Sequence, residues 1–240
     1  MQSKIYSLYR SENPIVREAY SALTASLYTG NGSDKINTLV VTSTEPLVGK
    51  TSVATSIAIT LASWGKKTLL IDLDMRKPTE KNADYITGAA QFLQGSINLE
   101  GVLYSTNIEN LTYLPKGRIN GNPVGLLCSD LLTELLENAK KSFNYIIIDT
   151  APLDGVSDAA ILASKADGAI MVAKMNKTTL DAINSAKESL ESYNTNLLGI
   201  ILNQVDKKNY KNFFKSYKYY NNLNRKMSKV TESKKGVMPA

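Results

Sequence analysis

The sequence has few of the features that mark exported or membrane-spanning proteins. Among its 240 residues only Cys128 is a cysteine, so an internal disulfide is excluded and a reducing compartment is favoured. The longest apolar stretches, such as residues 57–62, fall far short of the roughly 20 residues that a membrane-spanning helix requires. Residues 1–10 lack the apolar core and the small-residue cleavage site of a secretory leader. We therefore expect a cytoplasmic protein.

The net charge of +6 is unevenly distributed, and most of the chain carries no excess of positive charge. Residues 206–240 contain ten Lys and Arg against two acidic residues, which gives this segment +8 and leaves −2 for all the others. The basic charge thus belongs to a tail attached to a near-neutral body. For this reason we expect no nucleic-acid partner.

Short apolar, β-branched runs alternate with longer helical patterns up to residue 205. This alternation predicts an α/β fold with a mostly parallel central sheet and helices on both faces. The predicted strands cover residues 38–42, 68–71, 111–114, 145–148, 169–173 and 198–202. The predicted helices include residues 52–64, 178–193 and an N-terminal helix over 14–28, with Asn13 as its cap. After residue 205 the periodicity ends, so we expect one domain over 1–205 and a flexible basic tail over 206–240.

A phosphate-binding loop follows the first predicted strand of the sheet. Residues 43–51 read Ser-Thr-Glu-Pro-Leu-Val-Gly-Lys-Thr and lead directly into an Ala/Ser/Ile-rich helix. In this context backbone N–H groups face an anion, Lys50 reaches the outer phosphates and the hydroxyl of Thr51 ligates Mg²⁺. Thr44 stands where the usual motif has glycine, so this segment alone also fits a loop without a ligand. The expected nucleotide contacts are Pro46, Leu47, Val48, Gly49, Lys50, Thr51 and Ser52.

Two other predicted strands end in acidic residues. Asp72 and Asp74 are two positions apart, so an extended chain points both side chains the same way, and Asp149 follows a run of bulky apolar residues in the Walker B arrangement. A single aspartate at a strand end often only caps a loop. One basic and two acidic strand ends together indicate a ligand crevice at the C-terminal edge of a parallel sheet. Carboxylates there can hold Mg²⁺ and accept a proton, so the sequence predicts a Mg-ATP site in a three-layer P-loop NTPase fold.

With these motifs the chain resembles the bacterial tyrosine kinases (BY-kinases) of capsule and exopolysaccharide synthesis, in the Gram-positive, soluble-subunit form of the CpsD/CapB type. The resemblance covers almost the whole chain. It rests on Thr-Ser-x-x-Pro-x-x-Gly-Lys-Thr at 42–51, Ile-Asp-x-Asp-x-Arg-x-Pro at 71–78 and Ile-Ile-Asp-Thr-Ala-Pro at 147–152. Ser157-Asp158-Ala159 also matches, and the segment at 71–78, the Walker A′ motif, is the most specific.

The resemblance implies a role for each charged residue of the site. Lys50 would contact the phosphates of ATP, and Thr51, Asp72 and Asp149 would hold Mg²⁺. Either Asp72 or Asp74 would activate the incoming tyrosine hydroxyl. Phosphoryl transfer depends mostly on positioning and charge neutralisation, so these groups form a sufficient set.

Two further residues receive roles from the same resemblance. Arg76 would lie beside the acidic residues of the Walker A′ motif and take part in catalysis. Asn203, just after the last predicted strand, would contact adenine, although an asparagine at this position is equally explained as a turn residue.

Switch ATPases of the MinD and ParA type share the sheet and both acidic motifs. They carry a second lysine five residues before the P-loop lysine, and in this chain that position is Glu45. The following residue, Pro46, matches the kinases, so the loop favours a kinase over a switch ATPase.

The loop and the N-terminal helix depart from the kinase pattern. The kinases usually read Pro-Gly-Glu-Gly-Lys, whereas this chain has Leu47 and Val48. If the loop requires a positive φ at Leu47, the side chain costs roughly 1–2 kcal/mol. The kinases also use Glu-x-x-Arg-x-x-Arg as a subunit contact, and here Ser21 and Thr24 replace both arginines. Homo-oligomer formation therefore stays an open alternative, although the arginines of the usual subunit contact are absent.

The tail contains a cluster of tyrosines, namely Tyr210, Tyr217, Tyr219 and Tyr220. Aromatic residues among lysines stack bases of single-stranded nucleic acid, and basic residues are drawn to anionic membranes. Beside an ATP site with a proton-accepting carboxylate, these tyrosines would serve as phosphoacceptors in trans. We favour this third interpretation, with which peripheral membrane association is compatible.

The sequence therefore predicts an ATP-dependent protein-tyrosine autokinase that regulates capsular or exopolysaccharide synthesis. The alternative is a nucleotide-binding adaptor of the same machinery that Leu47 and Val48 have left catalytically weak, and a nucleic-acid-binding ATPase is a third hypothesis. The resemblance also implies a separate membrane adaptor of the polysaccharide co-polymerase type. This adaptor would activate the kinase and recruit it from the cytoplasm to the inner face of the cell membrane.

Overall fold

The computed structural model describes residues 5–29, 36–77 and 86–206. The chain divides into two units, residues 1–204 and 205–240. The fold and the site described below belong to the first unit. The predicted tail, with Tyr210, Tyr217, Tyr219 and Tyr220, lies outside the described residues apart from Asp206.

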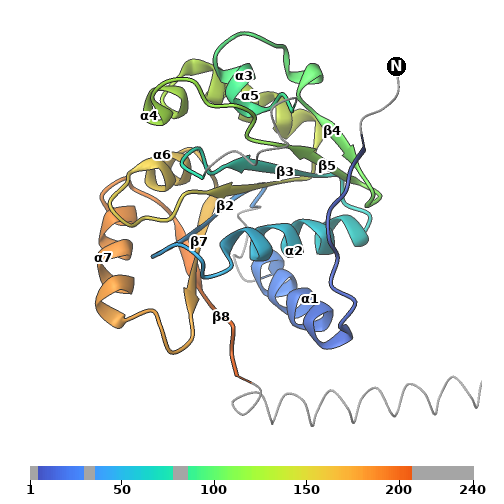
Figure 1. Ribbon diagram of the computed structural model, residues 1–240. Helices are drawn as coiled ribbons and strands as arrows, with labels where there is room; N and C mark the ends of the chain where they lie inside the picture. Colours follow the sequence, from blue (N-terminus) through green and yellow to red (C-terminus); the bar gives the residue numbers. More distant parts are fainter. Residues whose placement is uncertain (1–4, 30–35, 78–85, 207–240) are drawn as a thin grey trace, which may run out of the picture. The chain divides into compact units, whose positions relative to one another are not determined.

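The strands of the described residues form one eight-stranded sheet in the order β1-β4-β5-β3-β6-β2-β7-β8 (Figure 1). All neighbouring pairs are parallel except β4 with β5. The strands are β1 (Ile5–Tyr6), β2 (Thr38–Ser43), β3 (Thr68–Leu73), β4 (Tyr104–Thr106), β5 (Leu111–Leu114), β6 (Tyr145–Thr150), β7 (Gly168–Lys174) and β8 (Leu197–Asn203). All six predicted strands are confirmed, and the two short strands β1 and β4 were not predicted.

The helices connect these strands in the alternation that the sequence predicts. They are α1 (Pro14–Thr29), α2 (Lys50–Ser63), α3 (Ala89–Leu93), α4 (Pro123–Leu127), α5 (Asp130–Ser142), α6 (Asp158–Ser164) and α7 (Leu180–Glu191), with a short 3₁₀ helix, η1 (Leu99–Gly101). The predicted cap of α1 is confirmed, because the backbone N–H of Ile15 donates to Oδ1 of Asn13 at 3.0 Å. Within the described residues no helix combines the length and the apolar character needed to cross a membrane.

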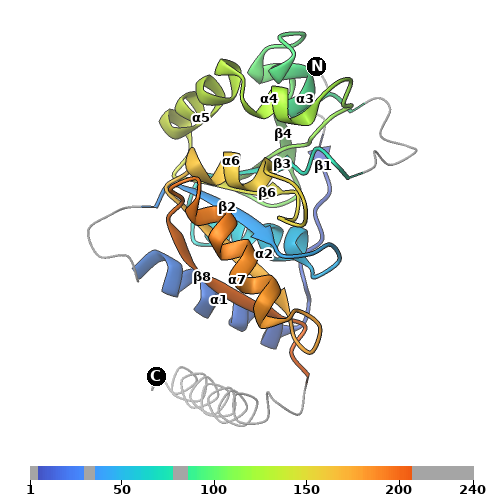
Figure 2. The same ribbon diagram turned by 90° about the vertical axis from the view of Figure 1, so that its left-hand side faces the viewer.

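Buried side chains alternate between the two faces of the sheet. Val40 belongs to an apolar cluster with residues of α3 to α7, whereas its neighbour Val41 belongs to a second cluster with residues of α1 and α2. The same alternation separates Leu69 from Leu70 in β3. Helices therefore cover both faces, as Figures 1 and 2 show, and the predicted three-layer α/β fold is confirmed.

The strands that carry the candidate site residues are neighbours in the middle of the sheet. β2 pairs with β6, and β6 pairs with β3, in both cases in parallel. The register places Asp72 directly opposite Asp149. Because parallel strands end at the same edge, the P-loop and both acidic motifs meet at that edge.

Candidate active site

The P-loop takes a conformation that two left-handed residues define. Leu47 has φ 64° and Gly49 has φ 90°, which confirms that the loop requires a positive φ at Leu47. The side chain of Leu47 is 89% exposed, while that of Val48 is fully buried and anchors the loop in the core below it. Gly49 has a second constraint, because a Cβ at this position would lie 2.3 Å from Nδ2 of Asn203.

Asn203 at the end of β8 lies against the P-loop. Its Nδ2 donates a hydrogen bond to the carbonyl of Val48 at 2.8 Å. The structure thus brings together two residues that are far apart in the sequence, and it places Asn203 at the nucleotide loop. Its contact with adenine stays a prediction.

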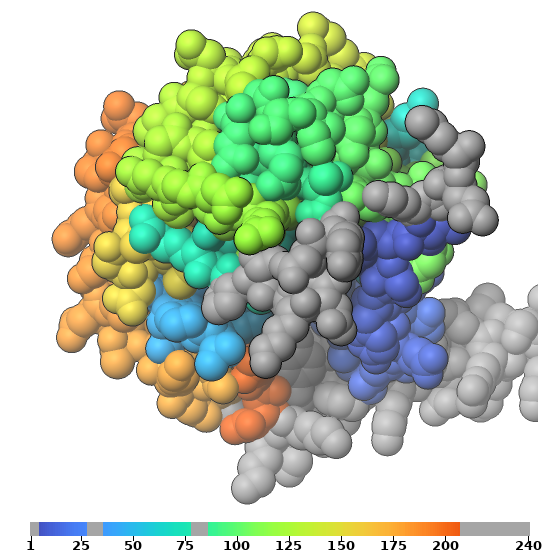
Figure 3. Space-filling view, turned by 45° about the horizontal axis from the view of Figure 1, so that its top comes forward, coloured from blue at the N-terminus to red at the C-terminus, as the bar shows by residue number. Residues whose placement is uncertain are grey.

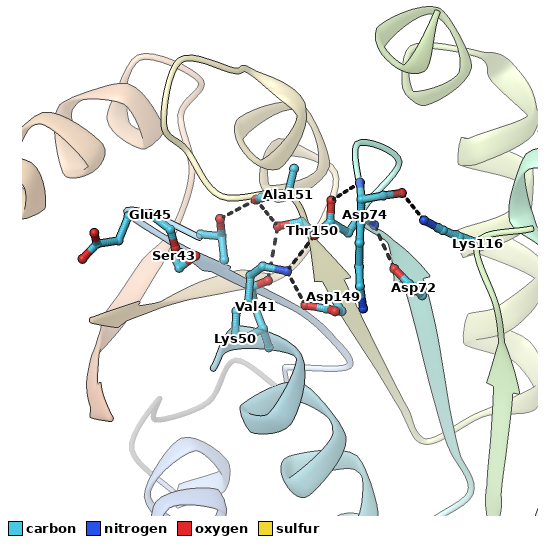
Figure 4. A network of polar contacts seen from close by, with 12 residues as sticks. Val41, Ser43, Glu45, Lys50, Asp72, Asp74, Lys116, Asp149, Thr150 and Ala151 are labelled. Atoms are coloured by element: carbon cyan, nitrogen blue, oxygen red, sulfur yellow. Dashed lines mark hydrogen bonds and ion pairs between the residues drawn. The ribbon is translucent and has the colours of Figure 1, made fainter. Parts of the chain in front are cut away.

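Lys50, the first residue of α2, lies between the two acidic motifs (Figure 4). Its Nζ is 2.7 Å from Oδ1 of Asp149 and 3.4 Å from Oδ2 of Asp74. All three side chains are nearly buried, so these ion pairs are little screened by solvent. The sequence prediction that one basic and two acidic strand ends converge is confirmed by these distances.

Asp72 lies beside this group and has a different environment. Its Oδ1 accepts a hydrogen bond from the backbone N–H of Asp74 at 3.0 Å. Burial and the neighbouring carboxylate of Asp149 raise the pKa of Asp72 to about 6. Burial also raises the pKa of Asp149, and Lys50 and the hydroxyl of Thr51 oppose that rise. A carboxyl group with a pKa near neutrality is suited to accept a proton.

The oxygen donors at this edge fit Mg²⁺. Within the described ranges no group of three or more His, Cys, Asp or Glu side chains is arranged to hold a metal ion. Mg²⁺ usually takes only one or two carboxylates and completes its shell with phosphate oxygens and water. The hydroxyl of Thr51 and the carboxylate of Asp149, whose pKa that hydroxyl lowers, supply hard oxygen donors of this kind.

Arg76 is paired with a residue to which the sequence analysis gave no role. Its Nε and Nη2 donate to the two carboxylate oxygens of Asp158 at 3.0 and 2.8 Å. The carboxylate of Asp158 is fully buried at the start of α6, whereas the side chain of Arg76 is 41% exposed. Arg76 therefore ties the Walker A′ segment to α6, and its part in catalysis stays a prediction.

Lys116 is a second buried cation that sequence reasoning missed. It follows β5, and its Nζ donates to the backbone carbonyl of Lys77. Its charge opposes the rise in the pKa of Asp72. Its position shortly after a correctly predicted strand was the signal that could have identified it, because β5 ends at the same edge as β3.

Thr44 occupies the position of the first P-loop glycine. It is buried, and no residue of the described part of the chain forms a hydrogen bond with its hydroxyl. A buried hydroxyl without a partner costs about 1–3 kcal/mol, a cost that a bound phosphate oxygen would remove. This orphan donor therefore agrees with a phosphate site in the loop.

Glu45, at the position of the second lysine of switch ATPases, points away from the other charged residues in Figure 4. Its carboxylate lies 3.0 Å from Nζ of Lys177 and accepts a hydrogen bond from the hydroxyl of Thr178 at 2.9 Å. Glu45 thus ties the P-loop to the segment between β7 and α7. Together the fold and the site define an α/β nucleotide-binding protein of the P-loop class.

Comparisons with known proteins narrow this class. Residues 37–204 match the family model described as an AAA domain. The chain is 38% identical to the tyrosine-protein kinase CpsD of Streptococcus pneumoniae, over 79% of this chain and 84% of that protein. Its structure is similar to the kinase domain of the Escherichia coli tyrosine kinase ETK, with a TM-score of 0.74 and 29% identity over 83% of each chain. The chimerical protein CapA2B2 gives the same TM-score at 28% identity, over 84% of this chain and 94% of that one.

The chain therefore belongs to the bacterial tyrosine-protein kinases, a family of the P-loop NTPase type.

Proposed function

We propose that the protein is an ATP-dependent protein-tyrosine autokinase that regulates capsular or exopolysaccharide synthesis. The observation that carries this proposal is the convergence of Lys50 with Asp149 and Asp74, with Asp72 directly beside them. The names of the relatives support it, since CpsD of S. pneumoniae is a tyrosine-protein kinase and a Klebsiella pneumoniae relative is a putative tyrosine-protein kinase in the cps region.

In the proposed reaction the oxygen of a tyrosine hydroxyl attacks the γ-phosphorus of ATP. The new P–O bond replaces the bond to ADP, and the hydroxyl proton passes to Asp72. We assign this proton to Asp72 rather than Asp74, because Asp74 is paired with Lys50 and accepts the backbone N–H of Lys77. Oδ1 of Asp72 is engaged by the N–H of Asp74, which leaves its other oxygen for the proton or for Mg²⁺.

The remaining site residues bind and orient ATP. Lys50 exchanges its contact with Asp149 for the phosphates, and the N–H groups of the P-loop, with the hydroxyl of Thr44, surround the phosphate oxygens. Thr51 and Asp149 would hold Mg²⁺, which would neutralise negative charge on the phosphates of ATP. Asn203, the last residue of β8, contacts the adenine, since its side chain already lies against the P-loop at Val48.

The tail tyrosines are the proposed acceptors, in trans, and a membrane adaptor of the polysaccharide co-polymerase type is the proposed activator. The adaptor brings the kinase to the inner face of the membrane, where the tail's charge of +8 also binds anionic lipid. Four phosphotyrosines add roughly −6 to −8 and release the tail. Binding to phosphatidylserine vesicles should therefore fall on phosphorylation, and unchanged binding would rule out this release.

A nucleotide-binding adaptor with weak catalysis is the second candidate function. The observation that favours it is the positive φ of Leu47, a strained position that the kinases usually fill with glycine. Such a protein would bind Mg-ATP at the same residues and regulate the machinery without phosphoryl transfer.

Incubation of the purified protein with Mg-ATP separates the two functions. Phosphotyrosine is measured with and without the cytoplasmic segment of the membrane adaptor, with Lys50→Met as the inactive control. The kinase predicts phosphotyrosine that Lys50→Met abolishes. ATP binding without phosphotyrosine under either condition would favour the nucleotide-binding adaptor.

A further inference from the structure

The strained backbone of the P-loop is held by contacts on both sides of Leu47. Leu47 has φ 64°, and its exposed side chain makes no packing contacts that would fix this conformation. A non-glycine residue keeps a left-handed conformation only where the surrounding structure enforces it. The constraint must therefore come from other residues of the loop, and Glu45 and Val48 are the two that are anchored.

Glu45 anchors the first half of the loop. The hydroxyl of Thr178 donates to Oε1 of Glu45 at 2.9 Å, and Nζ of Lys177 lies 3.0 Å from Oε2. The hydroxyl of Thr178 also accepts the backbone N–H of Lys174 at 2.9 Å, which leaves its own proton for Glu45. Within the loop, the hydroxyl of Ser43 donates to the carbonyl of Glu45 at 2.9 Å. Both the backbone and the side chain of Glu45 are therefore fixed.

Val48 anchors the second half of the loop. Its side chain is buried, and its carbonyl accepts from Nδ2 of Asn203. The carbonyl of Asn203 accepts the backbone N–H of Met175 at 3.0 Å. Met175 and Thr178 belong to the same turn between β7 and α7, residues 175–179. The two anchors of the P-loop therefore lead to one turn and enclose Leu47 between them.

The order of the strands explains why these segments meet. β2, β7 and β8 are consecutive and parallel, so the P-loop, the β7–α7 turn and the end of β8 lie at the same edge of the sheet. Figure 3 shows the light blue residues of the P-loop against orange residues of the β7–α7 region, with the orange-red end of β8 beside them. The turn can therefore act on the loop directly.

We propose that Glu45 is a positioning residue that, through Thr178, holds the P-loop in its ATP-binding conformation before ATP arrives. The proposal rests on the proposed function, because it takes the P-loop as the ATP site. Without this contact Leu47 leaves the left-handed region, and ATP then binds only the fraction of molecules in which the loop has returned to it. Glu45 points away from Lys50 and Asp149 (Figure 4), so it acts on ATP affinity through the loop.

The hydrogen bond from Thr178 should contribute more to this effect than the ion pair with Lys177. The side chain of Lys177 is 47% exposed and that of Glu45 is 27% exposed, so solvent and salt weaken their attraction. The hydroxyl of Thr178 is already oriented by the N–H of Lys174. Glu45→Gln keeps an oxygen acceptor for Thr178 and loses only the charge, so it should retain most of the effect of Glu45.

The first test measures the Kd of a non-hydrolysable ATP analogue with Mg²⁺ by titration calorimetry on full-length variants. Glu45→Ala and Thr178→Val should raise this Kd roughly fivefold or more, which corresponds to the strain of one left-handed residue. Glu45→Gln and Lys177→Met should stay within about twofold. The matched control is Glu191→Ala, which removes the carboxylate of an exposed ion pair at the other end of α7 and should leave the Kd unchanged.

A second test connects the effect to Leu47. In the Leu47→Gly background the loop has no strain to maintain, so adding Glu45→Ala should raise the Kd by about twofold at most. If Glu45 only stabilised the fold, Glu45→Ala would raise the Kd by the same factor in both backgrounds. Positioning through Leu47 therefore predicts that the two substitutions are not additive.

Kinase kinetics separate positioning from a general loss of structure. At saturating ATP, Glu45→Ala should keep its kcat within about twofold of the native value, while its KM for ATP rises. The KM for a tyrosine peptide should stay unchanged, because Glu45 acts only on the loop that binds ATP.

The results separate this proposal from the kinase function. An unchanged Kd in a folded Glu45→Ala protein, or an equal rise in both backgrounds, would overturn the positioning role while leaving the kinase intact. A Glu45→Gln protein as weak as Glu45→Ala would overturn the assignment to Thr178. Absence of phosphotyrosine in the native chain would count against the kinase function only, because calorimetry requires no catalysis. In that case a raised Kd in Glu45→Ala and Thr178→Val would still support the positioning role.

Discussion

The backbone at Leu47 stores strain in a loop whose side chain contributes no packing. With φ 64° and 89% exposure, the residue carries the cost of a left-handed conformation without burial to offset it. Leu47→Gly removes that cost, and the greater freedom of glycine in the unfolded chain cancels part of the gain. We expect a net stabilisation of about 0.5–1 kcal/mol, seen as a melting temperature raised by roughly 1–4 °C.

The same variant shows where the strain acts. Because the folded loop already holds this conformation, the Kd for ATP should change less than about threefold. A fivefold or greater tightening of ATP binding with an unchanged melting temperature would contradict this account. It would mean that the loop adopts the strained conformation at Leu47 only when ATP binds.

Asp72 couples the stability of the fold to pH. Its folded-state pKa of about 6 lies above the ordinary value of 3.8, so ionised Asp72 destabilises the folded chain at neutral pH. As the pH falls below 6, the folded state takes up the proton before the unfolded state does, so this cost decreases and is gone below the ordinary value of 3.8. At pH 7.5 the free energy of unfolding of Asp72→Asn should therefore exceed that of the native chain by roughly 1–3 kcal/mol. The variant should melt at a higher temperature.

Thermal melts in EDTA between pH 7.5 and pH 4 check this expectation. The difference between the two proteins should be nearly constant above pH 6 and should shrink as the pH falls from 6 toward 4. Asp72→Asn should lose phosphoryl transfer at every pH. A variant that melts lower than the native chain at pH 7.5 would show that the carboxylate of Asp72 is stabilised where it lies.

The ion pair between Arg76 and Asp158 links the segment after β3 to α6, and its two side chains differ in burial. Arg76→Ala leaves the fully buried carboxylate of Asp158 without its partner, and this should cost about 2–4 kcal/mol. Asp158→Asn leaves a guanidinium that reaches water and should cost about 1 kcal/mol. The midpoints of urea unfolding measure both losses of stability. Lys187→Ala, which breaks the exposed Lys187–Glu191 pair, is the control and should lower the free energy of unfolding by less than about 0.5 kcal/mol. The reverse order would contradict the burial argument.

Elements with a strong local pattern could be predicted, and those defined by distant pairing could not. Each predicted strand is a run of apolar residues whose successive side chains pack against opposite helical layers, as Val40 and Val41 do. β1 has two residues and β4 has three, so neither carries a periodicity, and β1 exists because it pairs with a strand about 100 residues away.

The candidate site divides in a similar way. Lys50 was found from the P-loop motif, and Asp72 and Asp149 were found because each directly follows a predicted strand. Parallel strands bring their C-terminal ends together, which is why these residues meet. The partner of Arg76 could not be found from spacing, since Asp158 lies on another element and meets Arg76 only in the folded chain. The tail tyrosines stay a prediction, because they lie outside the described residues.

The central claim for the whole molecule is phosphoryl transfer from ATP to the tail of a second copy, and a mixing experiment tests it most directly. The acceptor is the full chain with Lys50→Met, which cannot phosphorylate itself. The enzyme is the full chain with Phe at 210, 217, 219 and 220, which offers no tail acceptor. Mass spectrometry after incubation with Mg-ATP should locate phosphate on Tyr210, Tyr217, Tyr219 or Tyr220 of the acceptor. Phosphate absent from these tyrosines, while the enzyme binds ATP normally, would contradict the account.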